Sequence, residues 1–206
     1  CGLVRRRFEQ AYEGCMGTRR NILLQAYFAR PTVRVARSLI GKYLVRSIEG
    51  REIAGRIIEV EAYVGPEDKA CHASKGRTQR TDVMFGVAGL SYVYLIYGMH
   101  HCLNVVTERE AFPAAVLIRA IDVEGELIDG PGRLCRALQI DRSLNRIDLT
   151  RRDQLWFEDR GDRIGSHRVV ALPRIGVDYA GEWAKKLWRF RLALARTPKK
   201  RSMKRK

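Results

Sequence analysis

Alternating apolar and polar positions dominate the middle of the chain and predict β-strands. Six segments either alternate with a period of two or form short apolar runs rich in β-branched and aromatic residues. These segments are 43–49, 53–63, 91–97, 102–107, 114–121 and 168–172. Because the connections between several of them are short, we expect antiparallel pairing rather than repeated parallel crossovers. The stretch 97–100 (YGMH) separates two strands and predicts a hairpin turn.

Helical periodicity marks three further segments. Pro31 can open a helix that Gly41 ends. Residues 130–133 (GPGR) lead into a second helix, and 180–190 has large apolar residues at helical spacing. Those residues are Trp183, Leu187 and Phe190. Together the elements predict a single α+β domain with a curved, mostly antiparallel, open-barrel-like sheet and flanking helices.

Both ends of the chain are basic and lack periodicity. A length of 206 residues fits one domain. We therefore divide the chain into a basic N-terminal extension at 1–22, one domain at 23–196 and a basic tail at 197–206, where six of ten residues are Lys or Arg.

The composition is that of an ordinary globular protein, with 46% hydrophobic and 30% charged residues. No apolar run reaches the roughly 18 residues that a membrane span needs. Residues 1–20 lack the apolar stretch of a secretory signal. We expect a cytoplasmic protein without a membrane partner, associated with the nucleoid if its source is bacterial.

The five cysteines are scattered and show no C-x-x-C spacing, which argues against a disulfide framework and a structural zinc site. Cys71-His72 and His101-Cys102 would supply four metal ligands if folding brought them together. However, adjacent residues of a strand point to opposite faces. We expect reduced thiols and no metal.

The net charge is strongly positive, because 39 Lys and Arg stand against 23 Asp and Glu, a formal balance of +16. Such a field attracts polyanions, and nucleic acid is the first expected partner. Ribosome association, an anionic membrane surface and an arginine-rich genome are alternative explanations that charge alone does not separate.

One strand combines a carboxylate with an aromatic ring. Strict alternation along 53–63 places Ile57, Glu59, Glu61 and Tyr63 on one face. Glu61 lies in the apolar context V-E-A-Y, where burial would raise its pKa and suit it to accept a proton from water. A cap, a pairing with arginine or a solvated position is the alternative for this glutamate.

Aromatic residues gather near this glutamate in the sequence. Tyr63, Tyr94 and His72 are residue types that sandwich a planar base and bind its edge. Tyr97 stands at the predicted hairpin, where it could project as a wedge into a duplex. Tyrosines also favour strands for packing reasons alone.

Three stretches carry a family resemblance: RIIEVEAYVGPEDKACH, YVYLIYGMHHCLNVV and VLIRA. They resemble the alkyladenine (3-methyladenine) DNA glycosylases. The similarity continues through FARPT, GPGRLCRAL and RIGVDYA, so that it covers about residues 27–190. The pair His100 and His101 departs from it, because relatives often have aromatic residues there.

The resemblance implies roles in catalysis and base binding. Glu61 matches the general base that activates the attacking water. Tyr63 would stack on one face of the flipped base and Tyr94 on the other, while His72 contributes ring and backbone contacts. Asn104 matches a residue that restricts the pocket against normal guanine.

The resemblance also implies contacts with DNA. Tyr97 matches the side chain that intercalates in place of the extruded nucleotide, and Arg119 matches a phosphate contact that holds the flipped nucleotide. The implied substrate is double-stranded DNA that contains 3-methyladenine, 7-methylguanine, hypoxanthine or ethenoadenine.

The implied activity is base-excision repair by a monofunctional glycosylase. Water would hydrolyse the N-glycosidic bond and leave an abasic site, because no lysine occupies an evident nucleophile position in the pocket motifs. Neither a metal nor an organic cofactor is expected, and a monomer is the expected state. The main alternative is a non-catalytic basic nucleic-acid-binding module. An RNA-modifying or formyl-transferring enzyme is a third reading, for which no cofactor loop is found.

Overall fold

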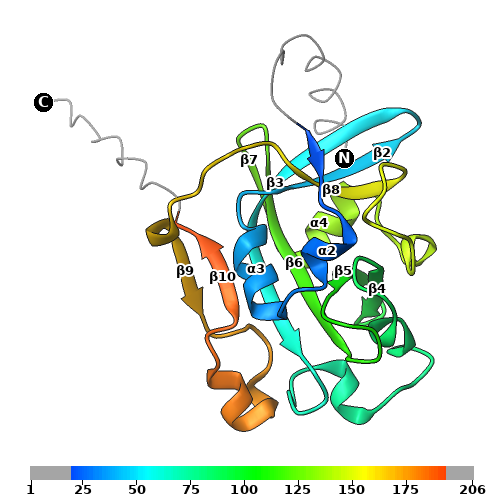
Figure 1. Cartoon of the computed structure of the whole chain (residues 1–206), viewed down its shortest axis with the longest axis vertical. Helices are drawn as coiled ribbons and strands as arrows, with labels where there is room; N and C mark the ends of the chain where they lie inside the picture. Colours follow the sequence, from blue (N-terminus) through cyan, green and yellow to red (C-terminus); the bar gives the residue numbers. More distant parts are fainter. Residues whose placement is uncertain (1–19, 194–206) are drawn as a thin grey trace, which may run out of the picture.

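The computed structural model describes residues 20–193, so the predicted tail at 197–206 and most of the predicted extension at 1–22 lie outside the described residues. Residues 20–193 form one α+β domain around a large antiparallel sheet that stays open (Figure 1), which confirms the predicted fold class. No helix in this part of the chain is long and apolar enough to cross a bilayer.

The sheet has ten strands in the order β1-β8-β2-β3-β6-β5-β4, and β10 pairs with β3, β9 with β10 and β7 with β6. The strands are β1 (Asn21–Ile22), β2 (Tyr43–Ile48), β3 (Arg51–Val64), β4 (Ser91–Ile96), β5 (His100–Val106), β6 (Ala114–Val123), β7 (Glu126–Asp129), β8 (Leu155–Asp159), β9 (Val169–Leu172) and β10 (Arg189–Leu192). β1, β7, β8 and β10 were not predicted from the sequence.

The longest strand, β3, changes partners along its length. Its first part pairs with β2, and its later part pairs with β10 and β6. The register with β6 shifts between Ile57 and Val60. Such a bulge bends a strand and increases its twist. The bulge also makes the predicted alternation wrong at Ile57. This residue packs in the main core together with its neighbour Ile58, not on the face of Glu59 and Glu61.

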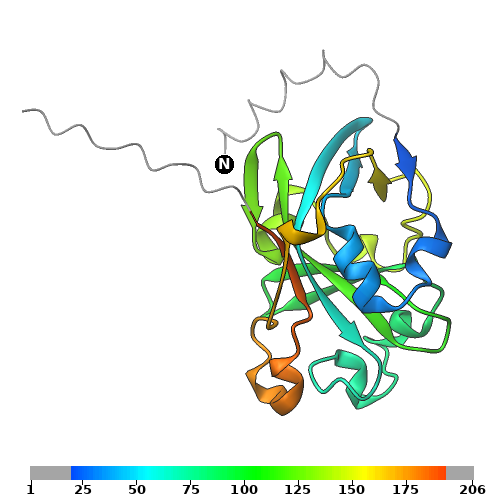
Figure 2. The same ribbon diagram turned by 60° about the vertical axis from the view of Figure 1, so that its left-hand side comes forward.

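The two faces of the sheet are covered differently. The main core joins one face to α2 (Gln25–Phe28), α3 (Thr32–Leu39) and α4 (Pro131–Ala137). Figure 2 shows α3 against the curved strands β3 and β6. The 3-10 segments η1 (His72–Lys75) and η2 (Asp82–Phe85) help to cover the other face, and a smaller cluster connects it to η5 (Asp178–Lys185). The two other 3-10 segments are η3 (Arg142–Leu144) and η4 (Ser166–Arg168).

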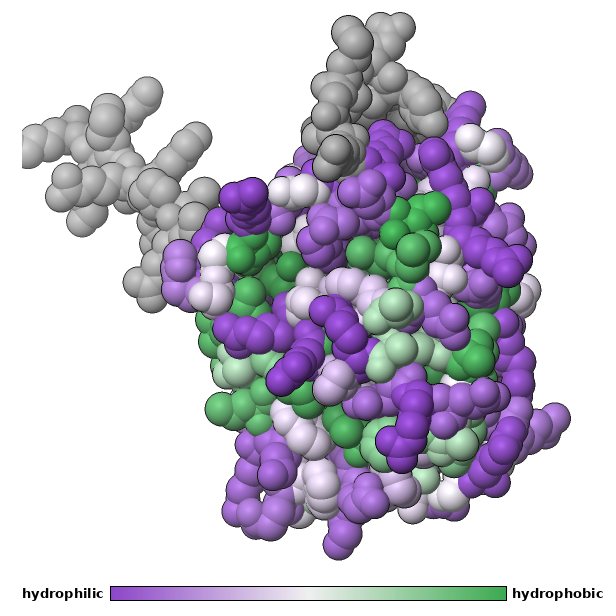
Figure 3. Space-filling model, viewed as in Figure 1, coloured by the Kyte–Doolittle hydropathy of each residue, from purple (hydrophilic) through white to green (hydrophobic). Residues whose placement is uncertain are grey.

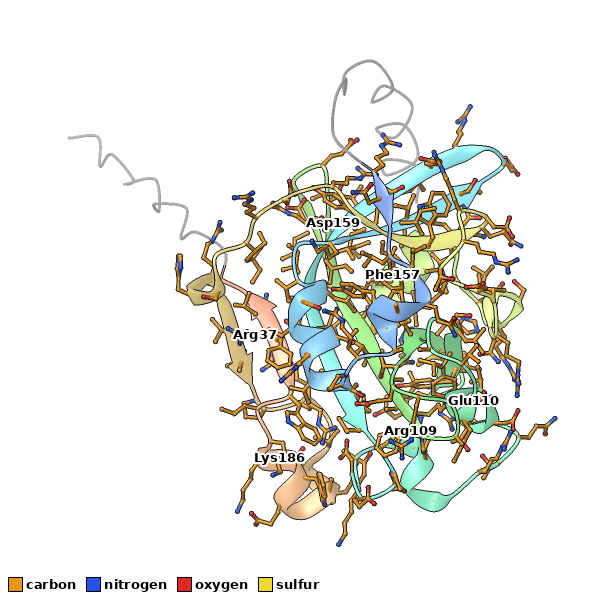
Figure 4. All side chains as sticks on the ribbon, in the orientation of Figure 1. Arg37, Arg109, Glu110, Phe157, Asp159 and Lys186 are labelled. Atoms are coloured by element: carbon orange, nitrogen blue, oxygen red, sulfur yellow. The ribbon has the colours of Figure 1, made fainter. Side chains whose placement is uncertain are left out.

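α3 forms because its apolar residues recur on one face. Val35, Ala36 and Leu39 are buried, each contributing roughly 1–3 kcal/mol by its removal from water. Gly41 follows the helix with φ +85°, and a Cβ there would lie 2.3 Å from Ile164. Arg37 reaches from α3 toward β10, with its guanidinium 5.8 Å from the ring centroid of Phe190 (Figure 4).

The predicted helix at 180–190 is wrong. A 3-10 segment, η5, ends at Lys185, and Gly181 interrupts it with the non-helical angles φ 59° and ψ −127°. Phe190 lies instead in β10, where it is buried between Arg189 and Arg191, which project to the opposite face of the strand. Trp183 and Phe190 are thus spaced as on one helix although they belong to different elements, η5 and β10. The alternation of RFRL indicates the strand.

Hydrophilic side chains predominate on the molecular face that carries α3, with apolar ones scattered among them (Figure 3). Scattered exposed apolar residues are normal for a folded domain. The face is therefore consistent with the high charge of the chain.

Candidate active site

Strand register brings most of the predicted site residues to one face of the sheet. Residues directly opposite each other in an antiparallel pair project to the same face. One such row crosses β4, β5, β6, β3 and β10 through Tyr92, Asn104, Leu117, Glu61 and Arg189. The adjoining rows add Tyr94 opposite Cys102 and Tyr63 opposite Ala115. Glu61, Tyr63, Tyr94 and Asn104 thus share the face opposite the main core.

Glu61 is completely buried, and both its oxygens accept hydrogen bonds. The backbone N–H of Ile175 donates to Oε1 at 2.8 Å, and the Tyr63 hydroxyl donates to Oε2 at 2.9 Å. Burial raises the pKa of Glu61, while Arg119, the Ile175 N–H and the Tyr63 hydroxyl lower it. The balance leaves the pKa above its usual range, as the apolar context V-E-A-Y predicts.

Tyr63 is held by more than its bond to Glu61. The guanidinium of Arg174 lies 4.8 Å from the ring centroid of Tyr63 and 5.2 Å from that of Trp188. Arg174 also pairs with Asp68, with both side chains fully buried and Nη2 2.8 Å from Oδ1. This buried pair ties the loop after β9 to the loop after β3, and the two loops lie side by side in Figures 1 and 2.

His72 and Tyr94 form a wall of aromatic rings. Their centroids are 4.6 Å apart in an edge-to-face arrangement. His72 Nδ1 is 3.0 Å from the Tyr92 hydroxyl. Burial, followed by the nearby charges of Arg80 and Lys75, lowers the pKa of His72 to about 4. The imidazole is therefore neutral at pH 7 and can stack on, or hydrogen-bond to, a planar ligand without adding charge.

Asn104 is buried and points its amide along the same face. Its Nδ2 donates to the Tyr92 carbonyl at 3.0 Å. The amide is therefore fixed by the β4–β5 hairpin rather than free to rotate. A polar group with one fixed orientation is suited to reject ligands with the wrong edge.

Arg119 lies between two carboxylates of β3. Its Nε is 3.0 Å from Glu59 Oε1 and 3.5 Å from Glu61 Oε1. Only 13% of the Arg119 side chain is exposed, and its hydrogen bond to Glu59 uses Nε alone. The two Nη groups are left for other partners, so the predicted phosphate contact stays compatible with this position.

Tyr97 stands apart from the buried face, at the tip of the β4–β5 hairpin. Its side chain is 83% exposed, and that of Met99 is 71% exposed. The backbone of Tyr97 is left-handed, with φ 53°, and Gly98 follows with φ 68°. The predicted hairpin is confirmed, and its tip presents apolar groups to solvent.

Several site residues were missed from the sequence. The Ile175 N–H is a backbone donor, so no side-chain pattern announces it. Asp68 and Arg174 lie within the stretches GPEDKACH and RIGVDYA, which drew attention for other residues. Glu59 was placed on the same face as Glu61 by alternation, but the arginines that surround it come from strands far away in the sequence, β6 and β10.

The cysteines and histidines form no metal centre in the described chain. No group of three or more His, Cys, Asp or Glu among residues 20–193 is placed to hold a metal. Cys71, Cys102 and Cys135 are buried free thiols. His100 packs against Gly132, at the edge of a cavity of about 270 Å³ beneath the hairpin.

Comparison with known proteins identifies the family. The family model described as methylpurine-DNA glycosylase (MPG) matches residues 26–196. A protein of Methanocella arvoryzae is 51% identical over 185 residues, which cover 82% of this chain and 91% of the relative. One of Myxococcus xanthus is 52% identical over 169 residues, covering 80% and 86%.

A third relative, from Legionella pneumophila (strain Paris), is 51% identical over 171 residues, covering 82% of this chain and 92% of the relative. All three carry the name "Putative 3-methyladenine DNA glycosylase". The match spans every strand of the buried site face and the loops that close it. The chain therefore belongs to the methylpurine-DNA glycosylase family, which confirms the resemblance of its motifs.

Proposed function

We propose that this protein excises alkylated or deaminated purines from duplex DNA by hydrolysing the bond between base and sugar. The candidate lesions are 3-methyladenine, 7-methylguanine, hypoxanthine and ethenoadenine. The observation that carries the proposal is the position of Glu61. It is a buried carboxylate that accepts hydrogen bonds from the Tyr63 hydroxyl and a backbone N–H, on the face that carries Tyr94 and is covered by the segment of His72. A module that only bound DNA would have no need for such a carboxylate.

The pocket supports the binding of a flipped base. Tyr63 would stack on one face of the base, and the wall formed by His72 and Tyr94 would cover the other. Asn104 would exclude normal guanine. Because an N3- or N7-alkylated purine is cationic, it stacks favourably on electron-rich rings and is also a good leaving group.

Hydrolysis follows from this placement. Glu61 accepts a proton from water while the water oxygen bonds to C1′, and the electron pair of the glycosidic bond leaves with the base. A cationic alkylated purine leaves in this way as a neutral base, whereas a neutral lesion such as hypoxanthine must also take up a proton to leave as one. The charge of Glu61 also stabilises the positive charge that develops on the sugar. The strands that form the site face, β3, β4, β5, β6 and β10, contain no lysine, so we expect no covalent amine intermediate and an intact abasic strand.

The hairpin would stabilise the extruded state. An exposed aromatic side chain beside an exposed methionine can enter the stack and fill the space that a flipped nucleotide leaves. Arg119 would hold a phosphate of that nucleotide. We expect a monomer that acts on genomic DNA, at the nucleoid in a bacterial cell, and that needs no cofactor.

The proposal is tested by release of free base from matched duplexes that contain each of the four lesions or none. Wild-type protein should release at least one lesion base and leave undamaged DNA intact, and the abasic strand should remain uncut until it is treated with alkali. Tight binding to every duplex without release of any base would reject hydrolysis and favour the binding module.

A further inference from the structure

Glu59 is a buried carboxylate that the proposed hydrolysis does not use. Its side chain is only 2% exposed, and it lies two residues before Glu61 on β3. A charge in this environment is costly unless partners compensate it. Three arginines do so, one from β6 and two from β10.

The arginines surround Glu59 from different sides. Arg119 Nε lies 3.0 Å from Glu59 Oε1, and Arg189 Nη1 lies 3.3 Å from the same oxygen. Arg191 Nη1 is 3.3 Å from Oε2, an ion pair without the alignment of a hydrogen bond. Arg189 is itself fixed, because its Nε donates to the Pro173 carbonyl at 2.7 Å. The two residues from β10 therefore clamp the carboxylate of Glu59 in place.

Arg119 has two carboxylates within reach and is bound more closely by the one that takes no part in hydrolysis. Its Nε is 0.5 Å nearer to Glu59, at 3.0 Å against 3.5 Å for Glu61. Guanidinium groups form strong bidentate pairs with carboxylates. Without Glu59, Arg119 would be free to move closer to Glu61 than its present 3.5 Å. Such a closer pair would occupy the Glu61 oxygens that receive the proton and the Arg119 Nη groups that we propose hold a phosphate.

We propose that Glu59, clamped by Arg189 and Arg191, is a positioning residue for the base excision reaction. It holds Arg119 by Nε, keeps Glu61 available to the attacking water and leaves the two Nη groups for a phosphate of the flipped nucleotide. This inference rests on the proposed glycosylase function and adds a residue that touches neither substrate nor reacting atoms.

The surroundings of Glu61 set the direction of the expected pH shifts. Burial raises its pKa, and Glu59 raises it as well, whereas Arg119, the Ile175 N–H and Tyr63 lower it. The other charged or titratable groups near it are Arg189 opposite it on β10, Arg174 and Cys102. Because hydrolysis needs the carboxylate form, the rate falls as pH drops through the pKa of Glu61.

The test is a double-mutant cycle of Glu59→Gln and Arg119→Gln, measured as single-turnover release of the lesion base across pH. Glu59→Gln should slow release at least tenfold. It should also move the acid limb, the low-pH fall of the pH–rate profile, to lower pH, because it removes a negative charge and frees Arg119 to approach Glu61. Arg119→Gln should move the acid limb to higher pH. If Glu59 acts through Arg119, the double variant should be far faster than the product of the two losses predicts.

A matched control lies on the same strand. Glu52 is also a β3 glutamate paired with arginine, 3.1 Å from Arg20, but it lies far from the site. Glu52→Gln should therefore leave the rate and the acid limb unchanged. Glu59→Asp, which keeps the charge, should retain more activity than Glu59→Gln. If Glu59→Gln does not fold, Arg189→Gln takes its place in the cycle.

The outcomes separate the two proposals. Additive losses with an unmoved acid limb, or a Glu59→Gln variant as fast as wild type, would overturn the role of Glu59 and leave the glycosylase proposal intact. A wild-type protein that releases no base from any lesion duplex would reject the glycosylase proposal, and the role of Glu59 with it.

Discussion

Glu61 keeps a carboxylate inside the protein because neighbouring groups offset the cost of its burial. Burial raises its pKa, and Arg119, the Ile175 N–H and the Tyr63 hydroxyl oppose that rise. A carboxyl group with a raised pKa is a stronger proton acceptor, yet it must stay ionised at the working pH. If Glu61 is the catalytic base that we propose, these three groups set the lower end of the pH range in which the enzyme works.

Tyr63→Phe tests this balance, because it removes the donor to Glu61 Oε2 and keeps the ring. Loss of a donor to the charged form raises the pKa of Glu61, so activity should be lost at a higher pH as the solution is acidified. We expect the acid limb of the single-turnover rate to move up by about one pH unit or less. Tyr43→Phe, whose hydroxyl bonds to Asp162 outside the site, should not move it. An acid limb that stays in place in Tyr63→Phe would contradict the balance.

The Asp68–Arg174 pair should contribute to stability rather than to chemistry. Both side chains are fully buried, so Asp68→Asn leaves an uncompensated guanidinium and should cost about 3–5 kcal/mol in the free energy of unfolding. Urea denaturation gives that quantity. Glu182→Gln is the control: it removes an exposed pair with Lys185 and should cost less than about 1 kcal/mol. Equal losses in the two variants would mean that the buried pair does not anchor the loops.

The β4–β5 hairpin combines a strained backbone with an exposed aromatic side chain at the same residue, Tyr97. Tyr97 has a left-handed backbone, which costs a non-glycine residue about 1–2 kcal/mol. An isolated aromatic at such a position gains nothing from packing, because 83% of it faces solvent. Strain of this kind is often retained at functional sites.

Tyr97→Gly should therefore separate stability from function. Relief of strain and the added chain entropy of glycine oppose each other, so the unfolding free energy should change by less than about 1 kcal/mol. Retention of a flipped lesion should fall at least tenfold, which the dissociation rate from lesion DNA measures. Tyr97→Phe keeps the wedge and should bind as wild type does. If Tyr97→Gly weakens binding to lesion and undamaged duplexes equally, the wedge role fails.

Helices and strands with a single hydrophobic periodicity were predictable from the sequence. Segments in which two periodicities overlap, or whose shape depends on a neighbouring strand, were not. α3, the β4–β5 hairpin and the long β-strands follow their own hydrophobic patterns. β10 was missed because Phe190 also lies at helical spacing from Trp183 and Leu187, and the alternation of RFRL covers only four residues. The bulge near Glu59 depends on pairing with β6, a tertiary effect that the alternation of one strand does not contain.

For the whole molecule, the motifs predicted which side chains meet but not how they are supported. Glu61, Tyr63, His72 and Tyr94 were named from the sequence, and strand register and ring contacts bring them together. The clamp around Glu59 joins three strands that are far apart in the chain. The donor from Ile175 is a backbone group. Such long-range and main-chain contacts leave no local pattern to read.

The overall charge of +16 predicts that affinity for DNA depends on salt while chemistry does not. If six or more phosphates are contacted, affinity for undamaged duplex should fall about 10³-fold between 50 and 200 mM salt. The single-turnover rate at saturating protein should change little over the same range, because Glu61 is enclosed and screening acts mainly on exposed charges. Salt-independent binding would contradict an electrostatic DNA interface.

The central claim is that Glu61 is the base that activates water. The most direct measurement compares wild type and Glu61→Gln on the same lesion duplex, with binding affinity and single-turnover base release determined for both. The amide keeps the shape of the carboxylate but cannot take the proton. We predict that Glu61→Gln binds the lesion within a few-fold of wild type and releases no base. Undiminished release by Glu61→Gln would remove Glu61 from the mechanism.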